Sequence, residues 1–545
     1  MTHPPRTLAA VVSTALTAGM LTACAGATSG NTTNTITYLD SAPYTGLYPP
    51  TAGYYPNGGI VNNITDRLLY QDPNTLELHP WIATELPEIN ADATEFTFNI
   101  RTDVTYSDGS KLTAANVVHN FDLYGGGDKT RKLTASEQIS NYDRGEVIDE
   151  DTVRFHFKKP APGFPQATST MNAGLLADST LAADLDGYGP GNATTIIGSG
   201  PFVITGEDVG TKLTLTARDD YNWAPPALPH QGRPAIDGIE WIVAPEASVR
   251  AGALIADQAD VARQIDGPVE RQLRQRGVGI FTARTNGVNN GLDLRFRHPL
   301  LQDIRVREAI AGAVNRDDIV DKLFTDSYPA ATSVLAKNAP GYQDNSAKLR
   351  YDPERSKELL DEAGWQPAKD GIRVKDGQRL SLGINHANVQ PRSREIVTML
   401  QQQLAAIGIE LQLLPGDRAA QNAAIKDINK VQVHHSMVAR ADLDVIKSEF
   451  AGDNRNSLLN VAKDKSVGDE KLAELLDKVA ITTDNGERAA LVGTIQRHLL
   501  DDFYSVPILE EPQMFGVNPR VEGFYTEPVG RPTFYQTKVV NQHND

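Results

Sequence analysis

The stretch IVTMLQQQLAAIGIELQL, residues 396–413, predicts a helix, a turn and a strand in direct succession. Its first part repeats an apolar residue every three or four positions, which is the period of an amphipathic helix. Gly408 then supplies the residue best able to end a helix in a left-handed conformation. After it, apolar and polar residues alternate as they do along a half-buried strand. This order is typical of α/β folds, and we expect an α/β protein.

Similar signals occur throughout the chain from Thr35 onward. Strict alternation of apolar and polar residues predicts strands at residues 96–100, 153–157 and 213–216. Another helix should begin at Asp352, a capping side chain followed by proline, and end near Gly364. Helices and strands are therefore mixed along the sequence, without a repeat of fixed period.

Cys24 is the only cysteine among the 545 residues and closes a short apolar segment. Apolar residues 8–21 are fewer than the roughly 20 that a membrane-spanning helix needs. The run LTAC that ends at Cys24 resembles the lipobox of bacterial lipoproteins, in which the cysteine sulfur carries a lipid. We therefore expect a lipoprotein signal peptide at residues 1–23 and a flexible tether at 24–34, with the exported protein anchored by lipid to the outer face of the cell membrane. The alternative is an ordinary buried thiol.

Length and charge restrict the class of protein further. A chain of this length exceeds a single hydrophobic core, so two or three domains are expected. The formal net charge of −17 argues against a nucleic-acid partner. A single cysteine excludes an intrachain disulfide, so folding depends on burial alone. We expect a monomer without a membrane-spanning segment after residue 24.

A series of short motifs gives the chain a family resemblance. In order, they resemble motifs of the family 5 extracellular solute-binding proteins, the receptors of peptide and nickel ABC importers. The matching segments are 80–83 (PWIA), 96–101 (FTFNIR), 106–114 (YSDGSKLTA), 151–155 (DTVRF), 158–160 (KKP), 197–202 (IGSGPF), 219–223 (DDYNW), 305–310 (RVREAI) and 315–320 (NRDDIV). Each motif alone is weak, but their common order makes coincidence implausible.

The resemblance implies a two-lobed, periplasmic-binding-protein-like (type II) fold of the α/β class, with an extra subdomain inserted in lobe I. Ligand would lie between the lobes, and the chain would cross between them twice. Transferred to this sequence, the boundaries are 35–72, 198–284 and 508–545 for lobe I, 73–197 for the inserted subdomain and 285–507 for lobe II.

Motifs of catalysis are missing from the sequence. It contains no G-x-S-x-G, H-E-x-x-H or G-x-x-x-x-G-K-[ST] pattern, so we expect no enzyme and no cofactor. His434 and His435 are adjacent, and neighbouring side chains of a strand point to opposite faces. A metal shared by these two histidines is geometrically poor, and we expect no metal site.

Two charged residues of lobe II are candidate ligand contacts by the resemblance. In oligopeptide-binding members, an aspartate in this region pairs with the ligand's α-ammonium group, and Asp442 occupies that place. The alternative is a solvated loop carboxylate. Arg440, two residues earlier, could instead hold a carboxylate, phosphonate or sulfonate through paired hydrogen bonds.

Further candidates lie where the family's groove is expected. Tyr54, Tyr55, Asn62 and Asn63 combine aromatic faces with amide donors and acceptors, which suit polar ligands. Asn289 and Asn290 lie at the expected lobe crossing. Both segments could equally be turns, which asparagine and glycine favour.

The resulting hypothesis is that the chain captures a small solute, preferably a peptide, and delivers it to an ABC permease with its ATPase subunits. A non-peptide solute, either an anionic small molecule or a metal complex, is the alternative. A secreted hydrolase or a sensor lipoprotein is a further alternative from another class.

Overall fold

The computed structural model describes residues 34–387, 390–452, 455, 457–459 and 468–540. The expected signal peptide and Cys24 lie outside these residues. Within them, no helix combines the length and the apolar character that crossing a bilayer requires.

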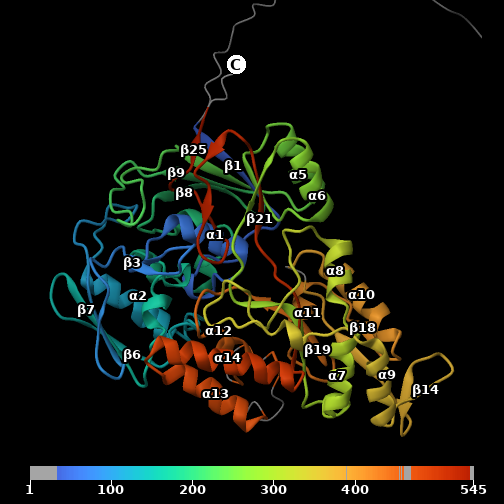
Figure 1. The fold of residues 1–545 in the computed structure, drawn as a ribbon. Helices are drawn as coiled ribbons and strands as arrows, with labels where there is room; N and C mark the ends of the chain where they lie inside the picture. Colours follow the sequence, from blue (N-terminus) through green and yellow to red (C-terminus); the bar gives the residue numbers. More distant parts are fainter. Residues whose placement is uncertain (1–33, 388–389, 453–454, 456, 460–467, 541–545) are drawn as a thin grey trace, which may run out of the picture. The chain divides into compact units, whose positions relative to one another are not determined.

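The largest sheet has seven strands, with β1 at its centre. β1 runs parallel to both neighbours, whereas the other strand pairs are antiparallel. Helices α5 (Ala247–Ile255) and α6 (Gly267–Gln275) pack against it (Figure 1). The strands, in spatial order, are β12 (Gly279–Thr282), β21 (Met514–Val517), β11 (Val261–Arg263), β1 (Thr35–Asp40), β10 (Gly238–Val243), β9 (Lys212–Ala217) and β8 (Phe202–Asp208).

A second sheet has five strands and contains the segment quoted first. β17 pairs in parallel with β18, and α10 (Ser393–Ala405) connects them. Gly408 has a φ of 91°, so the predicted helix, left-handed stop and strand are confirmed. The strands, in spatial order, are β18 (Glu410–Leu413), β17 (Ser381–Ile384), β19 (Val433–Val438), β13 (Val288–Leu294) and β20 (Ser505–Leu509).

The helices after β13 belong to the five-stranded part of the chain. α9 begins where the sequence predicts, because the side chain of Asp352 accepts a hydrogen bond from the backbone N–H of Arg355 at 2.9 Å. α13 and α14 pack against each other (Figure 1). The helices are α7 (Ile304–Ala313), α8 (Arg316–Leu323), α9 (Pro353–Glu362), α11 (Arg418–Ala424), α12 (Val445–Phe450), α13 (Glu470–Ile481) and α14 (Asn485–Asp501).

A third sheet of four strands contains two of the strands predicted from alternation. Its β5 and β7 bury every second residue, as the sequence pattern requires. The strands, in spatial order, are β4 (Glu88–Ile89), β5 (Glu95–Asn99), β7 (Thr152–Phe157) and β6 (Tyr142–Val147), and α2 (Ala114–Gly126) packs against β6 and β7. Short strands pair elsewhere: β2 (Leu69–Gln71) with β3 (Leu78–Pro80), β14 (Gln366–Pro367) with β15 (Arg373–Lys375), β15 with β16 (Gln378–Arg379), β22 (Val521–Glu522) with β25 (Lys538–Val539), and β23 (Tyr525–Thr526) with β24 (Pro532–Thr533).

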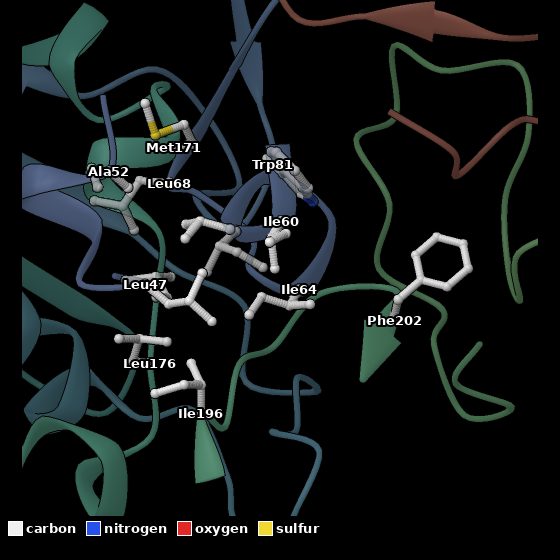
Figure 2. Packing of buried hydrophobic residues seen from close by; sticks show 14 of the residues in the cluster. Leu47, Ala52, Ile60, Ile64, Leu68, Trp81, Met171, Leu176, Ile196 and Phe202 are labelled. Atoms are coloured by element: carbon white, nitrogen blue, oxygen red, sulfur yellow. The ribbon is translucent and has the colours of Figure 1, made fainter. Parts of the chain in front are cut away.

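Helix α1 (Tyr55–Ile64) lies within the largest apolar core. Figure 2 shows Ile60 and Ile64 of this helix among side chains that come from distant segments, including Leu47, Trp81 and Phe202. The same core cluster extends from the seven-stranded sheet to the four-stranded sheet. Burial on nearly all sides therefore fixes α1, and with it the residues at its amino end.

The chain passes between the two larger sheets twice. It leaves the seven-stranded sheet after β12 and enters the five-stranded sheet at β13. It returns between β20 and β21. The residue boundaries assigned to the lobes and to the inserted subdomain stay a prediction.

Candidate functional site

A cavity of about 590 Å³ is lined both by segments that precede the five-stranded sheet in the chain and by segments that belong to it. One wall comes from segments that precede the five-stranded sheet in the chain: residues 50–55, 134–138 and 166–172. The opposite wall comes from Arg418, Arg455 and residues 437–442, which include the end of β19 and the segment after it. Residues 527–531, near the carboxyl end, complete the lining. Of the eight predicted ligand residues, the structure brings Tyr54, Tyr55, Arg440 and Asp442 together here.

The two tyrosines lie at the amino end of α1, each beside a guanidinium group. The guanidinium of Arg418 lies over the Tyr54 ring, 4.2 Å from its centroid. Those of Arg263 and Arg531 lie 5.5 and 5.0 Å from the centroid of the Tyr55 ring. Cations over aromatic faces attract each other through the ring quadrupole. The Tyr54–Arg418 contact joins α1 to α11, on the opposite wall of the cavity.

Arg440 and Asp442 form a buried ion pair just after β19. Nε and Nη2 of Arg440 donate hydrogen bonds to the two carboxylate oxygens of Asp442, at 2.8 and 2.7 Å. Burial raises the pKa of Asp442, although the guanidinium of Arg440 opposes this effect. The pair therefore places a positive and a negative group side by side at the cavity wall.

Glu137 extends this charge arrangement to the opposite wall. Its carboxylate accepts a hydrogen bond from Arg455 Nη2 at 2.8 Å and lies 3.6 Å from Arg440 Nη1. Burial alone would raise the pKa of Glu137, but the charges of Arg455 and Arg440 lower it overall. Within the described part of the chain, Arg440 Nη1 is buried and has no hydrogen-bond acceptor. It is therefore a buried donor without an acceptor in the wall of the cavity.

The structure places Asn62 and Asn63 outside the cavity lining. Their amide groups donate hydrogen bonds to the carbonyl oxygen of Pro532, at 3.1 and 2.9 Å, and so attach α1 to β24. Asn63 also accepts a hydrogen bond from the backbone N–H of Phe534 at 3.0 Å. Both side chains therefore form hydrogen bonds within the protein. Their role as ligand residues stays a prediction.

Asn289 and Asn290 also lie outside the cavity lining, in the fully buried strand β13. Asn289 donates to the carbonyl oxygen of Ser333 at 3.0 Å. Asn290 donates to the carboxyl group of Glu511 at 2.8 Å, and its amide oxygen lies 2.8 Å from His435 Nε2. Because Glu511 lies between β20 and β21, this contact links the two chain crossings. Their predicted contact with ligand likewise remains untested.

Sequence reasoning missed most of the charged lining: Glu137, Arg263, Arg418, Arg455, Glu527 and Arg531. Arg418 had a usable signal, because it opens a helix directly after a parallel strand, where α/β proteins commonly place binding residues. Arg263 ends β11, Glu527 and Arg531 share the turn between β23 and β24, and Glu137 and Arg455 lie in loops. Nothing in their local sequence distinguishes them from ordinary surface residues.

A family model, "Bacterial extracellular solute-binding proteins, family 5 Middle", matches residues 77–452. Protein XP55 of Streptomyces lividans is 27% identical over 493 residues, which cover 88% of this chain and 84% of that protein. The dipeptide-binding protein of Escherichia coli K12 is 22% identical over 510 residues, covering 87% and 88% of the two chains.

A solved structure shows the same fold. The crystal structure of NikA from Brucella suis in complex with Fe(III)-EDTA matches with a TM-score of 0.76 and 24% identity, over 92% of this chain and 99% of that chain. The predicted α/β, two-lobed fold of periplasmic binding proteins is thereby confirmed. The family model covers well over half of the sequence, and so this chain belongs to the bacterial extracellular solute-binding proteins of family 5.

Proposed function

We propose that the solute captured by this protein is a short peptide, held in the cavity lined by Tyr54, Tyr55, Arg440 and Asp442. Family 5 proteins bind a solute outside the cell membrane and work with the permease and ATPase subunits of ABC importers. They are binding proteins rather than enzymes, as the sequence predicted.

The Arg440–Asp442 pair is the observation that supports a peptide. Each carboxylate oxygen of Asp442 accepts one hydrogen bond from Arg440 and has a second lone pair available. Arg440 Nη1 offers an unused donor next to it. A short peptide carries an ammonium and a carboxylate, which complement these two groups. The cavity volume of about 590 Å³ lies within the range typical of small-ligand sites.

Lobe closure is the proposed mechanism of capture. Contacts already join the two cavity walls: Arg418 lies over Tyr54, and Gln71 Nε2 donates to the carbonyl oxygen of Ala441 at 3.2 Å. A solute that bonds both walls would stabilise the closed arrangement by its differential affinity for it. The lobe boundaries predicted from the sequence are part of this proposal.

An anionic, non-peptide solute is the second candidate. Arg418 forms no ion pair among the described residues and presents its charge at the cavity. Arg440 already neutralises Asp442, which weakens the attraction of that carboxylate for an ammonium group. Both observations favour a ligand rich in carboxylates, which guanidinium groups bind through paired hydrogen bonds.

Calorimetric titration distinguishes the two candidates. A peptide site should bind unmodified di- and tripeptides and lose affinity when their amino group is acetylated. Asp442→Asn should then weaken binding at least tenfold, whereas Asp149→Asn, an exposed carboxylate far along the chain, should not. If acidic non-peptide solutes bind instead and Arg418→Gln abolishes that binding, the second candidate replaces the first.

We also propose that a lipid on Cys24 holds the mature protein on the membrane as a monomer. Cys24 is the single cysteine and follows a signal-like apolar segment. Metabolic labelling with a fatty-acid analogue in the native host should mark the wild-type protein but not Cys24→Ala. Equal labelling of both proteins, or none of either, would contradict the anchor.

A further inference from the structure

Three ionisable side chains meet on one face of the five-stranded sheet, apart from the solute cavity. Asp293 of β13 and His434 of β19 are directly opposite each other in the antiparallel register. Glu449 approaches them from α12. One ligand atom from each of the three lies within 4.8 Å of the others. The sheet register therefore brings together one imidazole and two carboxylates.

Two buried atoms of this cluster lack the hydrogen bonds they require. In the described part of the structure, neither Nδ1 of His434 nor Oε2 of Glu449 has a hydrogen-bond partner. The Glu449 residue is only 1% exposed. Its other oxygen, Oε1, accepts hydrogen bonds from the hydroxyls of Ser436 and Ser457. Buried polar atoms are nearly always satisfied, so an unpaired carboxylate oxygen in a cluster with a second carboxylate indicates that the cluster can hold a cation.

Asp293 and Glu449 are buried, at 4% and 1% exposure, so their charges need compensation. Arg455 is close to Glu449, but its Nη2 donates a hydrogen bond to Glu137 at 2.8 Å. Arg295 is close, but its Nε and Nη1 donate to the carbonyl oxygens of Ser457 and Val431. Nδ1 of His434 lies 4.0 Å from the carboxylate of Asp293, which is too far for a hydrogen bond.

We propose that Asp293, His434 and Glu449 bind a divalent metal cation of the zinc type. One nitrogen and two carboxylate oxygens suit zinc, whereas calcium and magnesium prefer ligand sets made of oxygen alone. Zinc–ligand bonds of about 2.1 Å place the ligand atoms of a tetrahedral site about 3.4 Å apart. The ligand atoms here lie within 4.8 Å of one another, so the three side chains need to move inward only slightly. The hydroxyls of Ser436 and Ser457 orient Glu449 from the second coordination layer.

The site differs from the histidine pair that the sequence suggested. His435 faces the other side of β19, where its Nε2 lies 2.8 Å from Asn290 Oδ1. The argument that two adjacent histidines cannot share a metal therefore holds. The partners of His434 come instead from a neighbouring strand and a helix, which no local sequence pattern reveals.

A second cluster in the same protein supplies a matched control. Asp469, His498 and Asp502 also have ligand atoms within 4.8 Å of one another. Here, however, both ring nitrogens of His498 are engaged, with Asp469 at 2.8 Å and Asp502 at 3.1 Å. Asp469 also accepts hydrogen bonds from Leu472 N and the Tyr504 hydroxyl. The hydrogen-bonding atoms of His498 are thus already engaged, and Asp469 caps the amino end of α13. We expect no metal at this second cluster.

Metal titration of the full-length protein, purified without a histidine tag and stripped with a chelator, tests the proposal. Calorimetry should show one equivalent of zinc per chain and a higher unfolding temperature, with little response to magnesium or calcium. Cobalt substituted at the site should give the visible absorption of a low-coordinate nitrogen–oxygen site. Glu449→Gln and His434→Gln should each weaken zinc binding at least tenfold, whereas His498→Gln should leave it unchanged.

Three results would overturn the metal site. They are absence of saturable zinc binding by the wild-type protein, binding that survives unchanged in both Glu449→Gln and His434→Gln, and binding that is lost only in His498→Gln. If a variant fails to fold, the zinc stoichiometry and cobalt spectrum of the wild-type protein still decide the question. Asp293, His434 and Glu449 do not line the solute cavity, and the measurements use zinc alone, so they do not require the proposed ligand to be correct.

Discussion

Arg440 holds both carboxylate oxygens of Asp442 through two hydrogen bonds, and the two side chains are only 9% and 4% exposed. An ion pair removed from water to this extent recovers its desolvation cost only while both partners are present. The pair also lies in the wall of the cavity that we propose as the solute site. If the solute binds as proposed, stability and recognition therefore depend on the same two residues.

Removing Arg440 should destabilise the protein strongly. Arg440→Ala leaves a buried carboxylate without its partner, and we expect a loss of about 3–5 kcal/mol in the free energy of unfolding. Urea unfolding measures this change. Arg101→Ala is the control, since its partner Asp103 is largely exposed and such pairs contribute about 0–1 kcal/mol. Equal losses in the two variants would show that burial of the Arg440–Asp442 pair has no special effect.

Arg418→Ala should loosen α11 from the opposite wall of the cavity. Its guanidinium lies 4.2 Å from the Tyr54 ring centroid, and an exposed cation–π contact contributes about 0.5–1 kcal/mol. We expect faster hydrogen exchange at the α11 amides and little change in overall stability. Arg394→Ala, an exposed residue of α10, should leave α11 exchange unchanged. Unaltered α11 exchange in Arg418→Ala would mean that the contact does not hold the walls together.

Glu511 should make stability depend on pH. Burial raises its pKa to about 8 from the ordinary value of 4.5, so the folded protein keeps a proton that the unfolded chain releases. The stabilisation from this proton is complete below about pH 4.5 and is lost as pH rises through about 8. The total loss of stability across this interval is on the order of 5 kcal/mol. Glu511→Gln should remove this dependence, because its amide stays neutral.

Urea unfolding at pH 5, 6.5 and 8 tests the Glu511 prediction. Relative to wild type, Glu511→Gln should gain stability steadily as pH rises. Glu522→Gln, at an exposed position, should follow the wild-type curve. Parallel curves for wild type and Glu511→Gln would contradict the raised pKa.

Gly198→Ala should prevent normal packing against the carboxyl end of α1. A Cβ atom at this position would overlap the carbonyl oxygen of Ile64, which belongs to the backbone of α1 and cannot rotate away. We expect a loss of several kcal/mol, measured by thermal unfolding. Gly252 in α5 has no atom near its own Cβ position, so Gly252→Ala should instead stabilise the protein by about 0.5–1 kcal/mol. A wild-type unfolding temperature for Gly198→Ala would refute this close-packing argument.

Local patterns predicted the elements well. Alternation located β5, β7 and β9, and a capping aspartate followed by proline located the start of α9. These predictions succeeded because periodicity and capping depend on residues within a few positions of each other. Domain boundaries, in contrast, depend on contacts that composition does not encode.

Long-range contacts distinguish the candidate ligand residues that line the cavity from those that do not. Tyr54 and Arg440 line the cavity, whereas Asn62 and Asn290, with the same polar character, bond to other parts of the protein. Asparagine suits a ligand contact and a structural bond equally well, so its sequence context could not distinguish the two.

By itself, the sequence determined the α/β class, the family and the positions of several helices and strands, because short-range periodicity and ordered motifs carry this information. Only the tertiary structure decided that Arg440 pairs with Asp442 in a cavity, and that Asp293, His434 and Glu449 meet on one sheet face. Their neighbourhood is set by strand register and by the packing of segments far apart in the chain. No local pattern records these distances.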